Sequence, residues 1–308
     1  MMTSVITGAS GFIGRALSSE LVRRGDDVVG VTRAPSLPGL DKAIKWKKYP
    51  RDISGWSEVL GGASTVYHLA WSTLPEMSNK DPLADASENI GPALMLFEAV
   101  RRQPGIRVVF ASSGGTVYGT LTSVSANERH VTRPHCAYGV SKLAVEHYLT
   151  LYRDMWGVDG ISLRMGNPYG PGQNVSRNFG AISTFASHAA KGEPIRIFGD
   201  GTVVRDYIYI TDLVDAVIAA GQSRDDVATL NIGSGIGKSL NDVVEVLRGL
   251  AEPPPVVVDY VKGRDFDIPV SVLDISLAKV KLGWQPRTSF RDGVRATFEA
   301  MSKMATRP

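Results

Sequence analysis

The sequence predicts an α/β protein with a doubly wound parallel sheet, followed by a smaller mixed α/β C-terminal lobe. In the first half of the chain, short runs rich in β-branched residues alternate with longer segments of helical periodicity. This pattern is typical of buried parallel strands joined by helices. After residue 166 the pattern changes, because loop-rich stretches separate short elements of both kinds. We therefore divide the chain into residues 1–166 and 167–308, and we expect some segments of the second part to return to the first sheet.

The expected elements begin with a strand, a helix and a strand. Residues 4–7, 15–24 and 27–32 form this βαβ unit, with a turn at residues 8–14. The rest of the first part is expected to hold strands at 65–70, 107–112 and 160–164, and helices at 86–102 and 137–155. For the second part we expect helices at 180–191 and 211–222, and strands at 194–198, 204–210 and 229–232.

Composition and charge argue against several classes of protein. The chain has 308 residues, 43% of them hydrophobic and 21% charged, as expected of a globular protein with an ample core. Its 34 basic and 31 acidic residues are interspersed, which argues against a nucleic-acid-binding surface. The single cysteine, Cys136, excludes an internal disulfide, and the five histidines lack zinc-binding spacing, so we expect no metal. With no signal sequence or long apolar stretch, we expect a cytoplasmic protein that contacts no membrane.

A glycine-rich turn follows the first expected strand. Gly8, Gly11 and Gly14 are three residues apart and lead into the first helix. Glycine leaves room for a pyrophosphate group to approach the backbone, and the N–H groups at the start of a helix attract that anion. Together with the intervening Phe12 and Ile13, the turn predicts a site for a dinucleotide cofactor.

The second expected strand ends in Thr32 and Arg33, where an acidic residue would read the ribose 2′-hydroxyl of NAD. An acid would repel a 2′-phosphate, whereas threonine does not and arginine pairs with it. This favours NADP over NAD. The alternatives are that Arg33 stacks on the adenine or points to solvent.

Tyr138 and Lys142 are four residues apart, on one face of an expected helix. The phenol pKa, near 10, must fall by about three units before the group is a base at neutral pH. An ammonium about 4 Å away offers roughly 4 kcal/mol at an effective dielectric of about 20, and desolvation of the phenolate takes part of this back. We therefore expect the cationic ring of an oxidised nicotinamide to supply the rest. The phenol should be more acidic with oxidised than with reduced cofactor, which ultraviolet titration would test.

The glycine turn, the Tyr-x-x-x-Lys helix and the chain length resemble the extended short-chain dehydrogenase/reductase superfamily. Within it, residues from about 3 to 300 resemble the nucleotide-sugar 4-epimerases, the UDP-glucose 4-epimerase family. The resemblance implies a Rossmann domain over 1–166 that binds NAD or NADP, and a nucleotide-sugar-binding lobe over 167–308. It also implies a homodimer formed by helices 86–102 and 137–155. Ala93, Leu96, Phe97 and Val100 are one candidate face for that dimer, unless they face the sheet.

The resemblance also assigns roles to residues outside the motifs. It implies that Asp52 and Ile53 contact the adenine, that Leu69 and Ala70 lie beside the cofactor after His68, and that Asn89 matches the asparagine of the following helix. The implied substrate residues are Asn167, the diphosphate-binding Arg205 and Arg264, and Asp267, which holds the nucleoside ribose. Two arginines suit a diphosphate because each offers a fork of donors to its oxygens.

The stretch SSGGTVYG at residues 112–119 departs from the family pattern. The family usually has serine or threonine two residues before the Thr-Val-Tyr-Gly threonine, and this chain has Gly114. We expect Thr116 to bridge the sugar O4, with Ser113 as the alternative. The 4,6-dehydratases need an Asp-Glu pair where this chain has Gly115 and Thr116, so dehydration is not expected.

The resulting expectation is an enzyme that inverts C4 of a nucleoside-diphosphate hexose through a transient 4-keto sugar. Tyr138 takes the proton of the 4-hydroxyl while hydride passes to the nicotinamide. The alternative is a 4-keto-6-deoxyhexose reductase, or a dTDP-6-deoxyhexose 4-epimerase, in surface polysaccharide precursor synthesis. A third interpretation is a dinucleotide-binding redox sensor without catalysis, and the presence of both Tyr138 and Lys142 argues against it.

Overall fold

The computed structural model describes residues 2–33, 41–121, 123–175, 180–250, 255–263 and 268–305. Its largest sheet has seven strands, all paired in parallel. In spatial order these strands are β10 (Thr229–Ile232), β6 (Gly160–Met165), β5 (Arg107–Ser113), β4 (Thr65–His68), β1 (Thr3–Thr7), β2 (Asp27–Thr32) and β3 (Lys45–Lys48). β10, which pairs with β6, comes from the part of the chain after residue 166.

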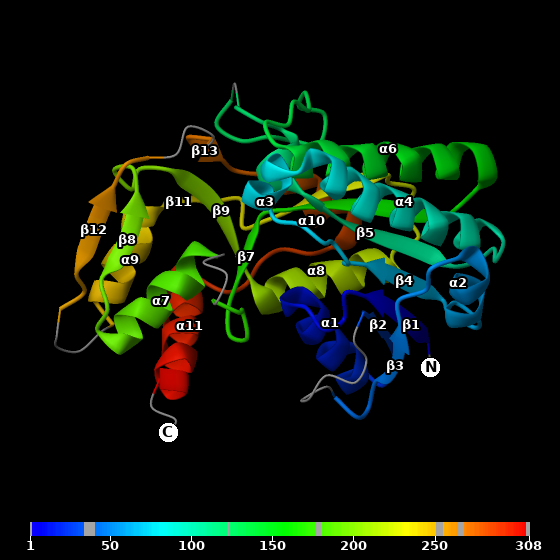
Figure 1. The fold of residues 1–308 in the computed structure, drawn as a ribbon, viewed down its shortest axis with the longest axis horizontal. Helices are drawn as coiled ribbons and strands as arrows, with labels where there is room; N and C mark the ends of the chain where they lie inside the picture. Colours follow the sequence, from blue (N-terminus) through cyan, green and yellow to red (C-terminus); the bar gives the residue numbers. More distant parts are fainter. Residues whose placement is uncertain are drawn as a thin grey trace.

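Helices cover both faces of the seven-stranded sheet (Figure 1). One face carries α1 (Phe12–Arg23), α8 (Ile210–Gln222) and α10 (Ser276–Leu282); the other carries α2 (Ile53–Val59), α4 (Pro82–Arg101) and α6 (Ala137–Trp156). The core on the first face includes Leu17, Leu213 and Ala278. The core on the second face includes Trp56, Phe97 and Leu149. The doubly wound Rossmann fold is therefore confirmed. No helix in the described ranges is both long and apolar enough to cross a membrane.

One candidate dimer face is wrong. Ala93, Leu96, Phe97 and Val100 are buried against the sheet, because their i, i+3, i+4, i+7 spacing forms the inward stripe of α4. The alternative, that they face the sheet, is correct.

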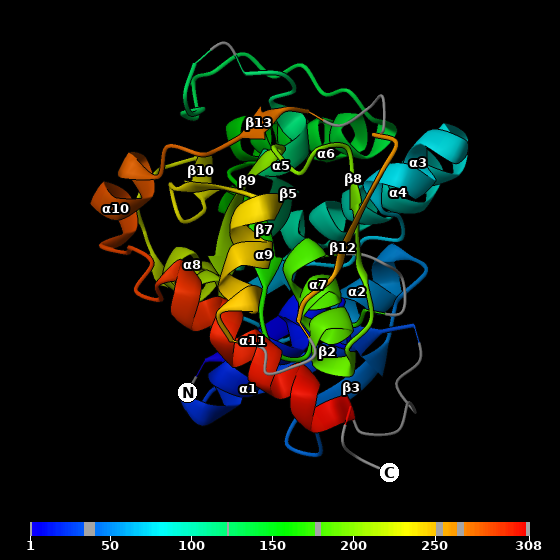
Figure 2. The ribbon, with the colours of Figure 1, turned by 90° about the vertical axis from the view of Figure 1, so that its left-hand side faces the viewer.

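The second lobe has its own sheets and helices (Figure 2). Its four-stranded sheet contains β7 (Asn167–Tyr169), β9 (Val204–Tyr209), β11 (Gly237–Ser239) and β13 (Val270–Ser271), and β8 (Ile195–Phe198) pairs with β12 (Val258–Val261). The helices α7 (Ala181–Lys191), α9 (Leu240–Arg248) and α11 (Phe290–Ala305) pack on one another around Phe185, Val243 and Val294.

Several element boundaries differ from those expected. The first helix starts at Phe12 rather than residue 15, so it begins inside the glycine turn. β4 ends at His68 rather than residue 70, because the Ala70 N–H leaves the sheet to bond the Thr7 hydroxyl, 3.0 Å away. α4 starts at Pro82 because the Asp81 carboxylate accepts the Ala84 N–H and caps the helix.

Candidate active site

The glycine turn lies at the carboxyl edge of the sheet, between β1 and α1. Gly8 has a positive φ of 67°, and a Cβ there would lie 2.9 Å from the Ala70 nitrogen. A Cβ on Gly14 would overlap the Gly8 carbonyl. Gly11 is the N-cap of α1 and offers no side-chain cap, so the first N–H groups of this helix suit an anion. The backbone forms a cradle that side chains would fill, which fits a dinucleotide pyrophosphate.

The ends of β2 and β3 lie beside this turn. The Thr32 hydroxyl is 3.0 Å from the Ser10 hydroxyl, so it faces the glycine turn, and Arg33 is exposed. Asp52 caps α2 by accepting the Gly55 N–H at 2.8 Å, and Ile53 is the first residue of that helix. The expected adenine-contacting pair therefore lies at the same edge of the sheet as the glycine turn.

Tyr138 and Lys142 lie on the first two turns of α6. The buried Lys142 Nζ donates to the Ala111 carbonyl at 2.6 Å and lies 5.5 Å from the centre of the Tyr138 ring. It also lies 3.6 Å from the centre of the Trp71 ring, whose edge packs against Tyr138. Burial raises the pKa of the Tyr138 phenol and lowers the pKa of Lys142 well below its ordinary value. The chain alone therefore does not poise the phenol as a base.

The turn after β5 approaches Tyr138 from the sheet. The Thr116 hydroxyl is buried, and no described group forms a hydrogen bond with it. A Cβ on Gly139 would lie 2.8 Å from the Thr116 carbonyl, so the glycine next to Tyr138 lets α6 pack directly on this turn. A Cβ on Gly115 would lie 3.4 Å from the Asn167 amide oxygen and 4.0 Å from the Ser113 hydroxyl. The turn that carries Thr116 thus lies against the start of α6, and Ser113 and Asn167 both lie close to Gly115.

Gly114 faces the other way, into the protein. A Cβ at this position would lie 2.7 Å from both methyl carbons of Leu273 and 3.1 Å from the Arg164 carbonyl. Leu273 is held there because its N–H donates to the Asp206 carboxylate at 3.2 Å. Leu273 therefore fills the space that a serine or threonine side chain at position 114 would need.

The substrate-lobe residues are only partly described. Arg205 lies on β9, and its Nη1 donates to the carbonyls of Val204 at 2.9 Å and Ile268 at 2.6 Å. The neighbouring Asp206 accepts from Ser234, both main chain and hydroxyl, as well as from the main chain of Gly235 and Leu273. Arg264 and Asp267 lie outside the described residues.

This chain is similar in sequence and in fold to proteins of known function. Residues 4–233 match the NAD dependent epimerase/dehydratase family. The chain belongs to this family. It is 32% identical to a UDP-glucose 4-epimerase of Mycolicibacterium smegmatis, over 97% of this chain and 98% of that protein. It is also 32% identical to a dTDP-4-dehydro-6-deoxyglucose reductase of Escherichia coli, over 94% of each chain. The solved UDP-glucose 4-epimerase of Thermotoga maritima with UDP-glucose superposes with a TM-score of 0.90 at 31% identity, covering 98% of this chain and 99% of the other.

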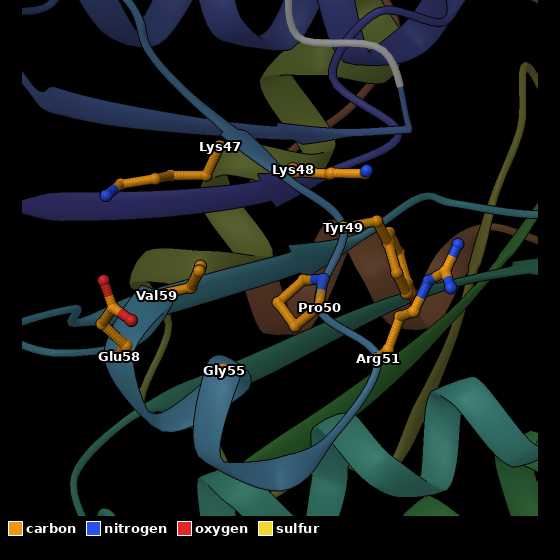
Figure 3. Close-up of a pocket in the computed structure, with 8 residues that line it drawn as sticks. All are labelled: Lys47, Lys48, Tyr49, Pro50, Arg51, Gly55, Glu58 and Val59. Atoms are coloured by element: carbon orange, nitrogen blue, oxygen red, sulfur yellow. The ribbon is translucent and has the colours of Figure 1, made fainter.

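Membership of the epimerase/dehydratase family confirms the predicted superfamily and an NAD-dependent enzyme. A cavity of about 450 Å³ lies between β3 and α2 (Figure 3). This cavity is lined by Lys47, Lys48, Tyr49, Pro50, Arg51, Gly55, Glu58 and Val59, none of which is a predicted site residue. In the described ranges, no group of three or more His, Cys, Asp or Glu side chains is arranged to hold a metal ion.

Several residues around Tyr138 and Lys142 were not predicted from the sequence. Trp71 stacks on the lysine, Ser78 accepts the Tyr138 N–H at 2.9 Å, and Asp85 accepts the Ser141 hydroxyl at 2.5 Å. The only sequence signal was the i, i+4 spacing of Asp85 and Asn89, which puts two polar side chains on one face of the helix. Both are buried, and Asn89 donates to the Asp85 carbonyl at 2.7 Å.

Proposed function

We propose that the chain is a nucleotide-sugar 4-epimerase that inverts C4 of a nucleoside-diphosphate hexose. The observation that carries this proposal is the pairing of Tyr138 with the Lys142 ammonium near the start of α6, which packs on the turn that carries Thr116. This turn follows β5, on the sheet edge that also holds the glycine turn. The extensive similarity to UDP-glucose 4-epimerases supports it.

The residues that would hold the dinucleotide are those of the predicted cofactor site. The list is Gly8, Gly11, Phe12, Ile13, Gly14, Arg33, Asp52, Ile53, Leu69, Ala70, Tyr138 and Lys142. When bound, the dinucleotide supplies the hydride acceptor for the sugar C4. The glycine cradle orients it, because no side chain intrudes there.

In the proposed mechanism, the Tyr138 phenolate accepts the proton of the sugar 4-hydroxyl, and the Lys142 ammonium stabilises the phenolate. Thr116 bridges the sugar O4 to the phenol, with Ser113 as the alternative donor. Arg205 and Arg264 anchor the diphosphate. Asp267 binds the nucleoside ribose, and Asn167 contacts the sugar. The hexose then rotates within the site, so that it is reduced on its other face. Dehydration is not proposed, because Gly115 and Thr116 supply no acid pair.

The test of this function compares the wild-type chain with Tyr138→Phe. Purified protein is incubated with UDP-glucose or dTDP-glucose, and the C4 epimer is measured by NMR. We expect turnover by the wild type and a loss of about 10²- to 10⁴-fold in the variant, the usual contribution of a general acid–base group. Full activity of Tyr138→Phe would contradict the proposed role of Tyr138, and the absence of turnover by the wild type would instead support a redox sensor without catalysis.

A second candidate, a 4-keto-6-deoxyhexose reductase that uses NADP, is favoured by one observation. At the end of β2, where an acidic residue would bind the ribose 2′-hydroxyl of NAD, this chain has Thr32, whose hydroxyl faces the glycine turn. Arg33 follows it, so the end of this strand places no carboxylate against a 2′-phosphate. Analysis of the dinucleotide released by denaturing the protein, and of reduced-cofactor absorbance with a 4-keto-6-deoxy sugar nucleotide, separates the two. Tightly held oxidised cofactor favours epimerisation, and stoichiometric consumption of NADPH favours reduction. Either activity would serve the supply of polysaccharide precursors in the cytoplasm.

We also propose a homodimer formed through the outer face of α6. Four exposed apolar or aromatic side chains lie on one face of this helix, at spacings of eight, three and four residues: Val140, Tyr148, Leu151 and Met155. A solvated apolar stripe of this kind suits pairing with a second copy, as the family resemblance implies. Sedimentation should show a dimer that Leu151→Glu dissociates. A wild-type monomer would contradict this proposal.

A further inference from the structure

The loop between β4 and α3 places an indole ring against the Lys142 side chain. The ammonium nitrogen of Lys142 lies 3.6 Å from the centre of the Trp71 ring, which is the distance of a close cation–π contact. The rings of Phe110 and Tyr138 are farther away, with their centres 5.0 and 5.5 Å from the same nitrogen. Trp71 is therefore the nearest of three aromatic rings around this cation.

Lys142 has few other partners. Its side chain is buried, and its ammonium donates to the Ala111 carbonyl at 2.6 Å. Among the described residues no carboxylate forms a salt bridge with it, and Glu146, one turn further along α6, pairs with Arg164 at 2.7 Å instead. Burial lowers the pKa of Lys142 well below its ordinary value, so the ammonium needs a compensating contact to stay charged. The face of an aromatic ring, which carries partial negative charge, is such a contact.

The indole gains no hydrogen bond from this position. The Nε1–H of Trp71 is buried, and no described group accepts from it. A buried donor without a partner reduces stability, and a phenylalanine or leucine would fill much of the same space without that donor. The advantage of tryptophan here is its ring face, which binds a cation more strongly than that of any other aromatic side chain.

The loop that carries Trp71 is fixed on α4. The next residue, Ser72, donates to the Asn89 amide oxygen through its N–H at 2.9 Å and through its hydroxyl at 3.2 Å. The hydroxyl of Thr73 also donates to a side chain of α4. The indole packs edge to face with the Tyr138 ring, with centres 5.8 Å apart and ring planes at 69°. The ring therefore contacts both members of the tyrosine–lysine pair from a defined position.

We propose that Trp71 is a positioning residue of the epimerisation: its indole face holds the Lys142 ammonium beside Tyr138 and keeps it charged. Trp71 takes no part in the transfer of proton or hydride. This inference rests on the proposed function of Tyr138 and Lys142. Because the ring stabilises the charged form, its removal should lower the pH at which Lys142 loses its proton, which is the basic limb of the pH profile.

Several charged or titratable groups surround Lys142, and none of them is substituted in the variants below. A change between variants therefore reports the side chain at position 71. The groups are Tyr138 and Glu146 on α6, with Arg164 of β6 as the partner of Glu146, Asp85 on α4, and His68 on β4. The charged side chains of α3 and β5 form ion pairs of their own, Glu76 with Lys80 and Arg107 with Asp159.

The experiment compares the pH profile of kcat/KM in the wild type, Trp71→Phe and Trp71→Leu. Both variants remove the indole N–H and some volume, but only phenylalanine keeps a ring face. We expect the basic limb to move to lower pH by about half a unit in Trp71→Phe and by about one unit in Trp71→Leu. Trp156→Leu, at the far end of α6, is the matched control and should leave the limb in place. A purely structural role of Trp71 would lower the maximum in both variants without moving the limb, and that result overturns the proposal.

A second measurement needs no substrate. Lysine labelled with carbon-13 at Cε is titrated by NMR, and the Lys142 signal is identified by its absence from Lys142→Met. The midpoint of this signal should fall from the wild type to Trp71→Phe to Trp71→Leu, by about one pH unit in all. Equal midpoints in the three proteins overturn the proposal.

These readouts separate the two failures. If the wild type epimerises no nucleotide sugar, the proposed function fails, while the lysine titration still tests Trp71. Should Trp71→Leu not fold, fluorinated tryptophan is incorporated throughout the chain instead, because fluorine weakens the negative ring face with little change of shape. The Lys142 midpoint should then fall in the wild-type sequence and stay in place in Trp71→Phe, which lacks this ring. Equal midpoints with and without fluorine in the wild-type sequence overturn the proposal.

Discussion

At position 114 this chain has glycine where the family usually has serine or threonine, and Leu273 packs against that glycine. Gly114 and Leu273 are complementary, since a side chain on the first would occupy the space of the second. We expect Gly114→Ser to lower the free energy of unfolding by about 1–3 kcal/mol through overpacking, and Leu273→Ala by about 2–5 kcal/mol through a cavity. In the double variant the new hydroxyl fills part of that cavity. The double variant should therefore lose less free energy of unfolding than the two single variants lose together, as measured by urea unfolding in a double-mutant cycle. Additive costs would show that the two sites are independent.

The hydroxyl of Thr116 permits a separate prediction. Thr116→Val keeps the shape of the side chain and removes a buried hydroxyl that no described group bonds. We expect unfolding free energy to be unchanged or slightly higher, and kcat to fall by roughly 100-fold. Ser113→Ala is the matched control. If it causes the larger fall in kcat, the bridging role belongs to Ser113.

Which residues could be predicted from sequence depends on how local their signal is. Gly8, Gly14, Tyr138 and Lys142 stand at short fixed spacings within one turn or helix, and the structure brings them to one edge of the sheet. Asp85 has no such signal, because its partner Ser141 is 56 residues away on another helix. The same is true of Leu273, whose packing on Gly114 depends on how the second lobe folds back.

At the scale of elements, α6 depends on another helix for its N-terminal cap. Its N-cap residue, Cys136, supplies no side-chain bond. Instead Asn79 and Ser78, on the short helix α3 (Pro75–Lys80), accept the Ala137 and Tyr138 N–H groups, each at 2.9 Å. α3 therefore fixes the start of the helix that carries the tyrosine.

Removing this cap should affect both stability and catalysis. We expect Ser78→Ala and Asn79→Ala each to reduce the free energy of unfolding by about 1 kcal/mol, as the loss of a helix cap does. Ser78→Ala should also lower kcat, because the Tyr138 backbone loses its partner. Ser87→Ala, on the exposed surface of α4, is the control and should stay within about 0.5 kcal/mol of the wild type. An effect of Ser78→Ala no larger than that of Ser87→Ala would contradict the capping role.

The elements predicted from sequence are those whose burial produces a clear pattern. β2 and β10 have the expected bounds, because most of their residues are apolar or β-branched. β3 reads KWKK and was not predicted, because it is an edge strand with exposed lysines. The six residues of α3 are too few to show helical periodicity, and its role as a cap is visible only in three dimensions.

At the scale of the whole molecule, one buried carboxylate joins the two lobes. Asp206 bonds the loop after β10 and the main chain of Leu273, and Leu273 packs on Gly114 at the end of β5. Its neighbour in sequence, Arg205, is the proposed diphosphate anchor. Burial raises the pKa of Asp206, while its hydrogen-bond donors oppose that rise. A short path of contacts therefore connects the proposed diphosphate site to the turn that carries Thr116.

His68 makes the stability of the whole fold sensitive to acid. Its ring is buried at the end of β4, where Nδ1 lies 2.9 Å from the Thr7 hydroxyl. Desolvation lowers its pKa to about 3, from 6.5 in the unfolded chain. The unfolded state therefore binds the extra proton between these two values, so stability is retained above pH 6.5 and lost as the pH falls toward 3.

The acid sensitivity can be assigned to this one side chain by comparison with His68→Gln. At pH 5 the histidine should have reduced the free energy of unfolding by about 2 kcal/mol relative to neutral pH, since each pKa unit corresponds to about 1.4 kcal/mol. Urea unfolding of both proteins at pH 7 and pH 5 measures this. The two proteins share their other titratable groups, so the difference between their pH dependences reports His68 together with its coupling to Lys142. If that difference is zero, the ring is protonated without penalty, and its burial does not govern the acid limit of the fold.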